Sequence, residues 1–137
     1  MLTIRTYQQK DKTAVIQLWQ DCNLVVPWND PAIDIQKKID IQPDLFFVGE
    51  LDGQIVSTCM AGYEGHRGWI NYLAVSPQFR RQGFGRRMML HAENELKKQN
   101  CPKINLQVRA HNTAVLQFYT SLGFKNDEVI SLGKRLD

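Results

Sequence analysis

The 137-residue sequence lacks the features that mark several large classes of protein. No apolar run approaches the roughly 18 residues that a membrane-spanning helix needs, and the first residues lack the basic start and apolar core of a signal peptide. The three cysteines, Cys22, Cys59 and Cys101, form no Cys-x-x-Cys pair, so free packed thiols are favoured over disulfides. No His, Cys or Asp grouping has zinc or iron spacing. We therefore expect a cytoplasmic protein with no metal and no membrane partner.

Charge is spread unevenly along the chain, although the formal net charge is only +3. The excess lies in four arginines within eight residues that contain no acid: Arg80, Arg81, Arg86 and Arg87. A nucleic-acid binder usually spreads its basic side chains over a face, whereas a focused cluster suits a small phosphorylated ligand. The content of 43% hydrophobic and 23% charged residues is that of a globular protein. The length fits one domain, so we expect a single domain over residues 1–137 and no nucleic-acid partner.

Alternating and apolar stretches predict a sheet with helices between some of its strands. Strands are predicted over 2–7, 45–51, 55–63, 69–75 and 104–108, with a closing hairpin near Phe124 and 129–132. Helices are predicted from a cap at Asp11 to Asn23, from a cap at Asp30 to before Pro43, over 79–99, and from a cap at Asn112 to Gly123. Asp52-Gly53 is the favoured hairpin turn between two of the strands. A helical crossover joins the strands at 69–75 and 104–108, which makes that pair parallel. The fold class is therefore α/β (α+β), with a mixed, mainly antiparallel sheet.

The residues after the strand at 69–75 have the pattern of an anion-binding turn. Gly83 and Gly85 let the backbone approach a diphosphate closely. The N–H groups over 81–86 would face the ligand at a helix start, where the helix dipole favours negative charge. Arginine side chains add charge-assisted hydrogen bonds to phosphate. Taken alone, Gly-x-Gly also fits an ordinary turn with solvated arginines.

Two other phosphate-binding patterns fit the sequence less well. The dinucleotide fingerprint needs a glycine or alanine where this chain has Met88, and the strand after the helix ends in Arg109 rather than in an acid. An NADPH-binding fragment is therefore a weak alternative. A P-loop is excluded because the sequence has no Gly-Lys-Ser/Thr.

The pattern Arg80-x-x-Gly83-x-Gly85, after Leu73-Ala74-Val75, resembles the signature of the GCN5-related N-acetyltransferases (GNAT). Asn112-x-x-x-x-x-Phe118-Tyr119 followed by Gly123-Phe124 resembles the family's helix-and-tyrosine segment. The chain is similar in particular to small bacterial members of the YpeA type, through Pro27-Trp28-Asn29-Asp30-Pro31 and Gly65-His66-Arg67-Gly68. The resemblance covers essentially the whole chain. It implies a splayed parallel strand pair and helices on both faces of the sheet.

The resemblance also assigns expected roles to particular residues. Leu73, Ala74 and Val75 would hold the thioester arm of acetyl-CoA through their backbone groups, with an oxyanion contribution from one N–H. The residues expected to bind the pyrophosphate are Arg80, Arg81, Gln82, Gly83, Phe84, Gly85 and Arg86. Asn112 would cap its helix, contact the cofactor, or do both. Tyr119 would protonate the leaving thiolate; the alternative is a packed core tyrosine.

The acceptor side of the site is less well defined by the sequence. Trp28 either walls the acceptor pocket or plugs the core edge. Glu64 and His66 either reach the pocket as the base, directly or through water, or are structural or substrate-facing. Many relatives carry a glutamate base on the strand before the bend, where this chain has Asn71 and Tyr72. The general base is therefore missing from that strand.

These observations predict an acetyl-CoA-dependent N-acetyltransferase that transfers acetyl directly to a primary amine, with the donor between the strands at 69–75 and 104–108. No cysteine has the setting of a nucleophile. The alternative is a non-catalytic acyl-CoA-binding sensor or regulatory module. The acceptor stays open between small molecules and protein amines. The oligomeric state stays open between monomer and homodimer, because a C-terminal edge strand could pair with a second copy.

Overall fold

The computed structural model describes all residues from 1 to 137. The chain divides into two compact units, Met1–Asn105 and Leu106–Asp137, and each is described by itself. The predicted single-domain organisation stays a prediction.

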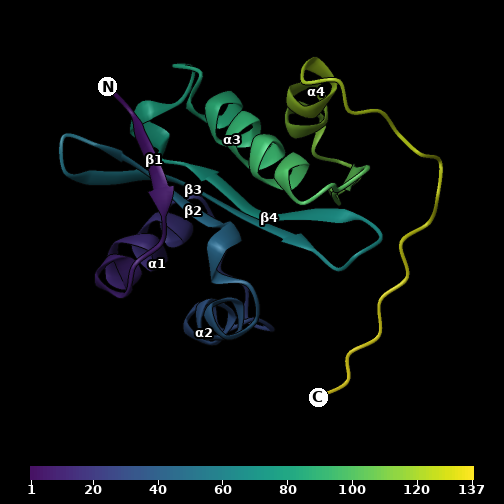
Figure 1. Cartoon of the computed structure of the whole chain (residues 1–137), viewed down its shortest axis with the longest axis horizontal. Helices are drawn as coiled ribbons and strands as arrows, with labels where there is room; N and C mark the ends of the chain where they lie inside the picture. The colour runs from purple at the N-terminus through teal and green to yellow at the C-terminus, as the bar shows by residue number, and fades with distance from the viewer. The chain divides into compact units, whose positions relative to one another are not determined.

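The first unit is built on a five-stranded sheet in the order β1-β2-β3-β4-β5 (Figure 1). The strands are β1 (Thr3–Thr6), β2 (Phe46–Leu51), β3 (Gln54–Tyr63), β4 (Gly68–Val75) and β5 (Ile104–Asn105). Neighbours from β1 to β4 are antiparallel, and β4 and β5 are parallel. The predicted mixed, mainly antiparallel sheet is therefore confirmed.

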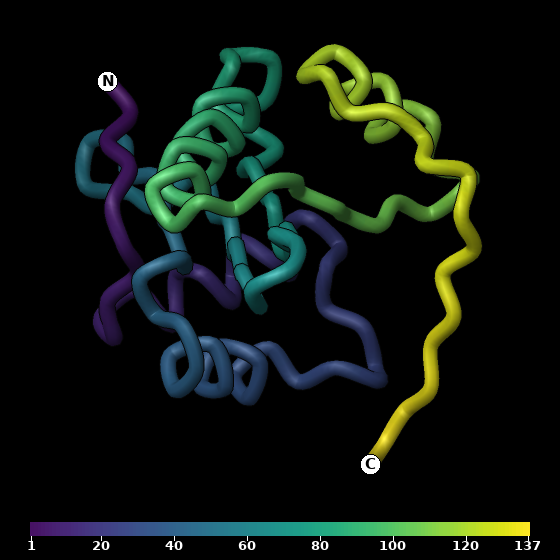
Figure 2. The backbone as a smooth tube through the Cα atoms, turned by 45° about the vertical axis from the view of Figure 1, so that its right-hand side comes forward, coloured from purple at the N-terminus to yellow at the C-terminus, as the bar shows by residue number.

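Helices cover both faces of this sheet. Helices α1 (Lys12–Asp21) and α2 (Pro31–Ile41) lie on one face and α3 (Phe84–Lys98) lies on the other (Figure 1 and Figure 2). The core on the α1 and α2 face consists of Val15, Leu18, Trp19, Ile35, Phe46, Val48, Met60 and Ala74. Helix α3 buries Phe84, Met88, Met89, Ala92 and Leu96. Each large side chain buried in this way stabilises the fold by about 1.5–3 kcal/mol.

The β2–β3 hairpin turns where the sequence predicted. Asp52 has φ 51° and Gly53 has φ 79°, so both turn residues are left-handed, as a two-residue hairpin of the favoured twist requires. The prediction for Asp52-Gly53 is confirmed.

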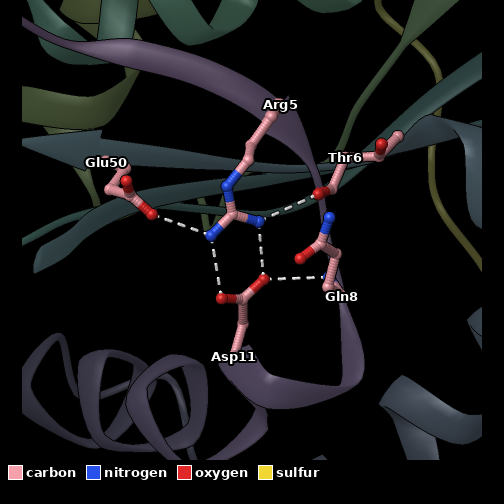
Figure 3. Close-up of polar contacts among 5 residues, drawn as sticks. All are labelled: Arg5, Thr6, Gln8, Asp11 and Glu50. Atoms are coloured by element: carbon pink, nitrogen blue, oxygen red, sulfur yellow. Dashed lines mark hydrogen bonds and ion pairs between the residues drawn. The ribbon is translucent and has the colours of Figure 1, made fainter. Parts of the chain in front are cut away.

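Asp11 precedes α1 as predicted, but its side chain does not cap that helix. Its two carboxylate oxygens accept hydrogen bonds from Arg5 at 2.8 and 2.9 Å, and Gln8 N–H donates to the same group at 2.8 Å (Figure 3). Arg5 also donates to Glu50 at 2.8 Å. Burial opposes ionisation, yet the Arg5 hydrogen bonds hold the pKa of Asp11 below its usual value. The capping role was wrong because this carboxylate joins β1 to the start of α1, while Arg5 extends the link to β2.

The structure differs from the other predictions mainly near the C-terminus. A short 3-10 turn, Pro77–Phe79, precedes α3, which begins only at Phe84. Strand β5 covers two residues instead of 104–108, and residues 125–137 contain no helix or strand, so the closing hairpin is absent. Local β propensity at 129–132 was a poor guide because strand formation depends on a paired partner. Helix α4 (Thr113–Ser121) lies where its cap and glycine predicted. No helix is long and apolar enough to cross a membrane.

Candidate active site

Strand β4 has an edge that is mostly without a partner strand. It pairs with β5 only through Gly68 opposite Ile104 and Trp69 opposite Asn105. From residue 70 to Val75 it pairs with β3 alone. The unpaired edge presents backbone donors and acceptors that another extended chain can bind.

A β-bulge interrupts β4 in the middle of this edge. Thr58 pairs with Ala74 and Met60 pairs with Asn71, so two residues of β4 lie opposite one residue of β3. One of the two, Tyr72, has φ 51°. A left-handed conformation costs a non-glycine residue roughly 1–2 kcal/mol, and neighbouring contacts must offset that cost.

Three contacts hold Tyr72 in this conformation, and a hydrogen bond between two of its partners supports them. Its ring stacks on Trp19 with centroids 3.8 Å apart and planes 12° apart, and its hydroxyl donates to Asp34 Oδ2 at 2.6 Å. Its carbonyl accepts from Thr58 Oγ1 at 2.8 Å, and Trp19 Nε1 donates to the same Oγ1 at 2.9 Å. Burial, followed by the Asp34 hydrogen bond, raises the pKa of Tyr72 well above its usual value. Side chains from α1, α2 and β3 therefore hold the bulge.

The end of β4 is fixed by its last carbonyl. The Val75 oxygen accepts from Cys22 Sγ at 3.3 Å and from Arg80 Nε at 3.2 Å. Leu73 is half-buried and Ala74 is buried. The residues expected to hold the thioester arm thus lie on a strand that is fixed just before and just after them.

The start of α3 is an open helix N-terminus. Gly83 occupies the N-cap position with φ 80°, and no side chain caps the first turn. A Cβ placed on Gly83 would meet no atom within 4 Å, so the space beside this backbone is open. Phe84 is buried and stacks on Phe79 with ring centroids 6.4 Å apart, so this contact holds the start of α3 against the preceding 3-10 turn. The first turn contains no acid, so its N–H groups are suited to an anion.

The arginines around this turn have different surroundings. Arg81, with φ 65°, Gln82 and Arg86 are exposed. Arg80 is also exposed, but its Nε donates a hydrogen bond to the Val75 carbonyl. Arg87 donates to the Leu2 carbonyl at 3.0 Å, so this arginine helps to join α3 to the first strand.

The second unit carries the two predicted residues of the helix-and-tyrosine segment. The side chain of Asn112 accepts from Val115 N–H at 3.3 Å, which confirms the predicted cap of α4. Tyr119 is half-buried on α4 and packs edge-to-face against Phe118 and Phe124, at 5.0 and 5.5 Å between ring centroids. Its role in chemistry stays a prediction.

The two residues predicted for the acceptor lie in loops. Trp28 is 54% exposed in the loop before α2, and its role at the acceptor pocket or at the core edge stays a prediction. Glu64 accepts hydrogen bonds from the backbone N–H groups of Arg67 and His66. These hydrogen bonds lower the pKa of Glu64, and the bond from the Arg67 N–H has the larger effect. Glu64 shapes its own loop, and its low pKa makes it a poor base.

The structure also contains features that the sequence did not indicate. A cavity of about 520 Å³ lies by α1 and the β2–β3 turn, lined in part by Arg5, Lys10 and Gln54, and it includes none of the predicted site residues. The contact between Asp34 and Tyr72 joins residues 38 positions apart, and no local sequence signal connects them. No group of three or more His, Cys, Asp or Glu residues could hold a metal ion.

Comparison with known proteins agrees with this geometry. Residues 12–124 match the family described as Acetyltransferase (GNAT) family. An acetyltransferase of Yersinia enterocolitica is 45% identical over 98% of this chain and 96% of its own length. An acetyltransferase of Pectobacterium atrosepticum is 46% identical, also over 98% of this chain and 96% of its own length. The chain belongs to the GNAT family and is an N-acetyltransferase.

Solved structures share the fold. Ard1 from Thermoplasma volcanium superposes with a TM-score of 0.82 at 26% identity, over 90% of this chain and 82% of that one. The ribosomal-protein-S18-alanine N-acetyltransferase of Escherichia coli superposes with a TM-score of 0.77 at 27% identity, over 91% and 78%. A predicted acetyltransferase of Clostridium acetobutylicum, solved with acetyl-CoA, has a TM-score of 0.73 at 20% identity, over 97% and 96%. The last likeness is one of fold alone.

Proposed function

We propose that this enzyme transfers the acetyl group of acetyl-CoA directly to a primary amine. The observation that carries the proposal is the unpaired edge of β4, followed after the turn over 76–83 by the uncapped start of α3. An extended pantetheine arm fits backbone groups along the edge, and a pyrophosphate fits the open N–H groups of the helix start. Acetyl-CoA supplies an activated thioester carbonyl; the chain supplies its binding and orientation.

The roles follow from these two surfaces. Backbone groups of Leu73, Ala74 and Val75 bind the arm and stabilise the developing oxyanion. The pyrophosphate is bound by the turn over 80–86, with Gly83 and Gly85 allowing close approach. Exposed Arg81 and Arg86 add positive charge there. Asn112 caps its helix and is our candidate for a further cofactor contact.

Tyr119 is the proposed acid that protonates the leaving thiolate. A Tyr119→Phe substitution retains the packing of the ring and removes the hydroxyl. We expect kcat to fall by about 10²-fold or more, with little change in acetyl-CoA affinity. Steady-state kinetics with calorimetry separates the two effects, and an unchanged kcat would remove the assigned role.

The acceptor enters, in this proposal, from the side that carries exposed Trp28 and the loop of Glu64.

The test of the proposed function begins with isothermal calorimetry of acetyl-CoA. It continues with a thiol-release screen of an alanine-starting peptide, a lysine peptide, glucosamine 6-phosphate and an aminoglycoside. Absence of binding at millimolar acetyl-CoA would overturn the donor assignment. Binding without thiol release from any amine would overturn the reaction.

A further inference from the structure

Helix α2 brings a carboxylate to the strand that lacks one before the bend. Asp34 lies in the first turn of α2, and its Oδ2 accepts a hydrogen bond from Tyr72 Oη at 2.6 Å. Tyr72 belongs to the bulge that leads directly into residues 73–75. A phenol coupled to a carboxylate thus adjoins the segment that we assign to the thioester.

This pair lies on the face of the sheet covered by α1 and α2. Tyr72 packs against the core cluster of that face, which includes Met60. Both side chains of the pair are only half-buried, so neither is sealed from a ligand. The loop that precedes α2 carries the exposed Trp28. An amine that approaches this face can therefore meet the phenol and the carboxylate together.

We propose that Tyr72 is a catalytic residue that accepts the proton of the attacking amine, and that Asp34 is the positioning residue that takes the phenolic proton in the same step. This inference rests on the proposed function, because it needs a thioester beside residues 73–75. It makes the acceptor a primary amine that arrives as an ammonium ion, attracted by the Asp34 carboxylate.

The step balances in atoms and charge. The ammonium first loses one proton to solvent, and the neutral nitrogen then forms a bond to the thioester carbon, whose C=O electron pair moves to oxygen. As an N–H bond breaks, a new bond forms at Tyr72 Oη, whose original proton moves to Asp34 Oδ2. Collapse of the oxyanion breaks the C–S bond and expels the thiolate, which takes a proton from the proposed acid Tyr119, and solvent then re-protonates Tyr119. Asp34 returns its proton to solvent, so the sum is one amide, one thiol and one released proton.

The surroundings of Tyr72 favour this assignment over other acids and bases. Helix α1 faces it with the uncharged Trp19 ring, and β3 faces it with Thr58. On α2, the Asp30 carboxylate is used by the helix cap and Lys38 donates to a β3 carbonyl. Asp34 is thus the charged group that acts on the Tyr72 phenol.

The titration behaviour of the phenol is consistent with this role. Burial, then the bond to Asp34, raises the pKa of Tyr72. The hydroxyl is therefore protonated near neutral pH and remains a donor to the carboxylate. A proton can then be passed on without a free phenolate. Glu64, by contrast, is held ionised by two backbone N–H groups, which makes it a weak proton acceptor.

The test uses Tyr72→Phe and Asp34→Asn in the full chain. Phenylalanine retains the ring on Trp19, and the asparagine oxygen can still accept the phenolic hydrogen bond, so both variants retain the packing of the bulge. Asp40→Asn is the matched control on the same helix, where Asp40 only accepts from Gln36 at 2.9 Å. Calorimetry with acetyl-CoA should give the wild-type affinity for all three variants.

Thiol release is then measured with two probes, strongly basic butylamine and weakly basic methoxyamine. With butylamine we expect kcat to fall by about 10²-fold in Tyr72→Phe and Asp34→Asn, with the KM for acetyl-CoA unchanged. Methoxyamine is weakly basic, so the N–H group of its adduct with the thioester carbon is acidic enough to lose its proton to water, and kcat should fall by less than about tenfold. Equal losses for both probes, or wild-type kcat with butylamine, would overturn the inference while leaving the proposed function in place. Binding of acetyl-CoA without acetylation of any amine by the wild type would overturn both.

A second readout does not depend on activity. Ultraviolet difference titration follows tyrosine ionisation in the folded protein, and the signal absent in Tyr72→Phe identifies Tyr72. In Asp34→Asn that signal should shift to lower pH, because the neighbouring negative charge has been removed. An unshifted signal would show that Asp34 does not act on the phenol and would overturn the coupling.

Discussion

Helices α2 and α3 begin in opposite ways. At the start of α2, Asp30 Oδ1 accepts hydrogen bonds from Ala32 N–H at 2.9 Å and Ile33 N–H at 3.3 Å, and Asp34 adds an acid to the first turn. At the start of α3, Gly83 offers no side chain and the first turn has no acid. Helix α2 thus neutralises the positive end of its own dipole, whereas α3 leaves its positive end open.

The difference separates a structural helix start from a binding one. A capped N-terminus gains stability from within the chain, typically about 1 kcal/mol. An uncapped N-terminus forgoes that gain and keeps N–H groups available for an external anion. Of these two helix starts, the uncapped one has arginines around it, so charge and geometry select the same helix.

The largest expected effect comes from giving α3 an acid of its own. Gly83→Asp places a carboxylate at the open helix start, where a Cβ would meet no atom within 4 Å. Repulsion between this carboxylate and the pyrophosphate should weaken acetyl-CoA binding by at least about 30-fold, from unit charges a few ångströms apart near a protein surface. Calorimetry at low salt measures the loss.

Gly83→Asn is the matched control for that substitution. Asparagine has the same shape, no charge, and a similar tolerance for the left-handed backbone that φ 80° requires. Any loss common to both variants reports backbone strain, and the excess in Gly83→Asp reports charge. Equal affinities in the two variants would remove the electrostatic account of this site.

A smaller effect is expected at the other helix. Asp30→Ala removes the α2 cap and should lower the free energy of unfolding by about 1 kcal/mol, without weakening acetyl-CoA binding. Asp30→Asn, which can still cap, should lose much less. Urea denaturation followed by circular dichroism gives the stabilities. A fall in acetyl-CoA affinity in Asp30→Ala would contradict the claim that the start of α2 is structural and only the start of α3 binds the ligand.

The smallest effect is expected for one exposed arginine beside the open start. Arg86→Gln removes a charge near the pyrophosphate and should weaken acetyl-CoA binding about two- to fivefold at low salt, since exposed ion pairs are worth up to about 1 kcal/mol. The deficit should shrink as salt increases. Calorimetry over a salt series tests this, and a deficit that does not change with salt would argue against a direct phosphate contact.

The sequence was a good guide to this comparison because capping signals are local. Asp30-Pro31 and Gly83-x-Gly85 could be identified from neighbouring residues alone, and the structure places helix starts at both. The Asp52-Gly53 turn was predictable for the same reason. Strand and helix order followed from periodicity, and hence so did the mixed sheet.

The features that could not be predicted depend on distant contacts. Asp11 has the right position for a cap, yet Arg5 uses its carboxylate. The hydrogen bond of Asp34 to Tyr72 exists only because α2 packs on the face where the bulge lies. Many relatives carry an acid on this strand itself, whereas in this chain the carboxylate beside β4 is that of Asp34 on α2. Contacts between residues far apart in sequence carry no local pattern.

The stack of Trp19 on Tyr72 also makes the bulge optically observable. Trp19 is fully buried, whereas Trp28 and Trp69 are 54% and 38% exposed. Acrylamide should therefore quench the fluorescence of the two exposed indoles and leave that of Trp19, whose ring faces the phenol at 3.8 Å. With Trp28 and Trp69 replaced by phenylalanine, the remaining emission would come from an indole in contact with the bulge. Any ligand that shifts Tyr72 would then change the fluorescence of the protein without an added label.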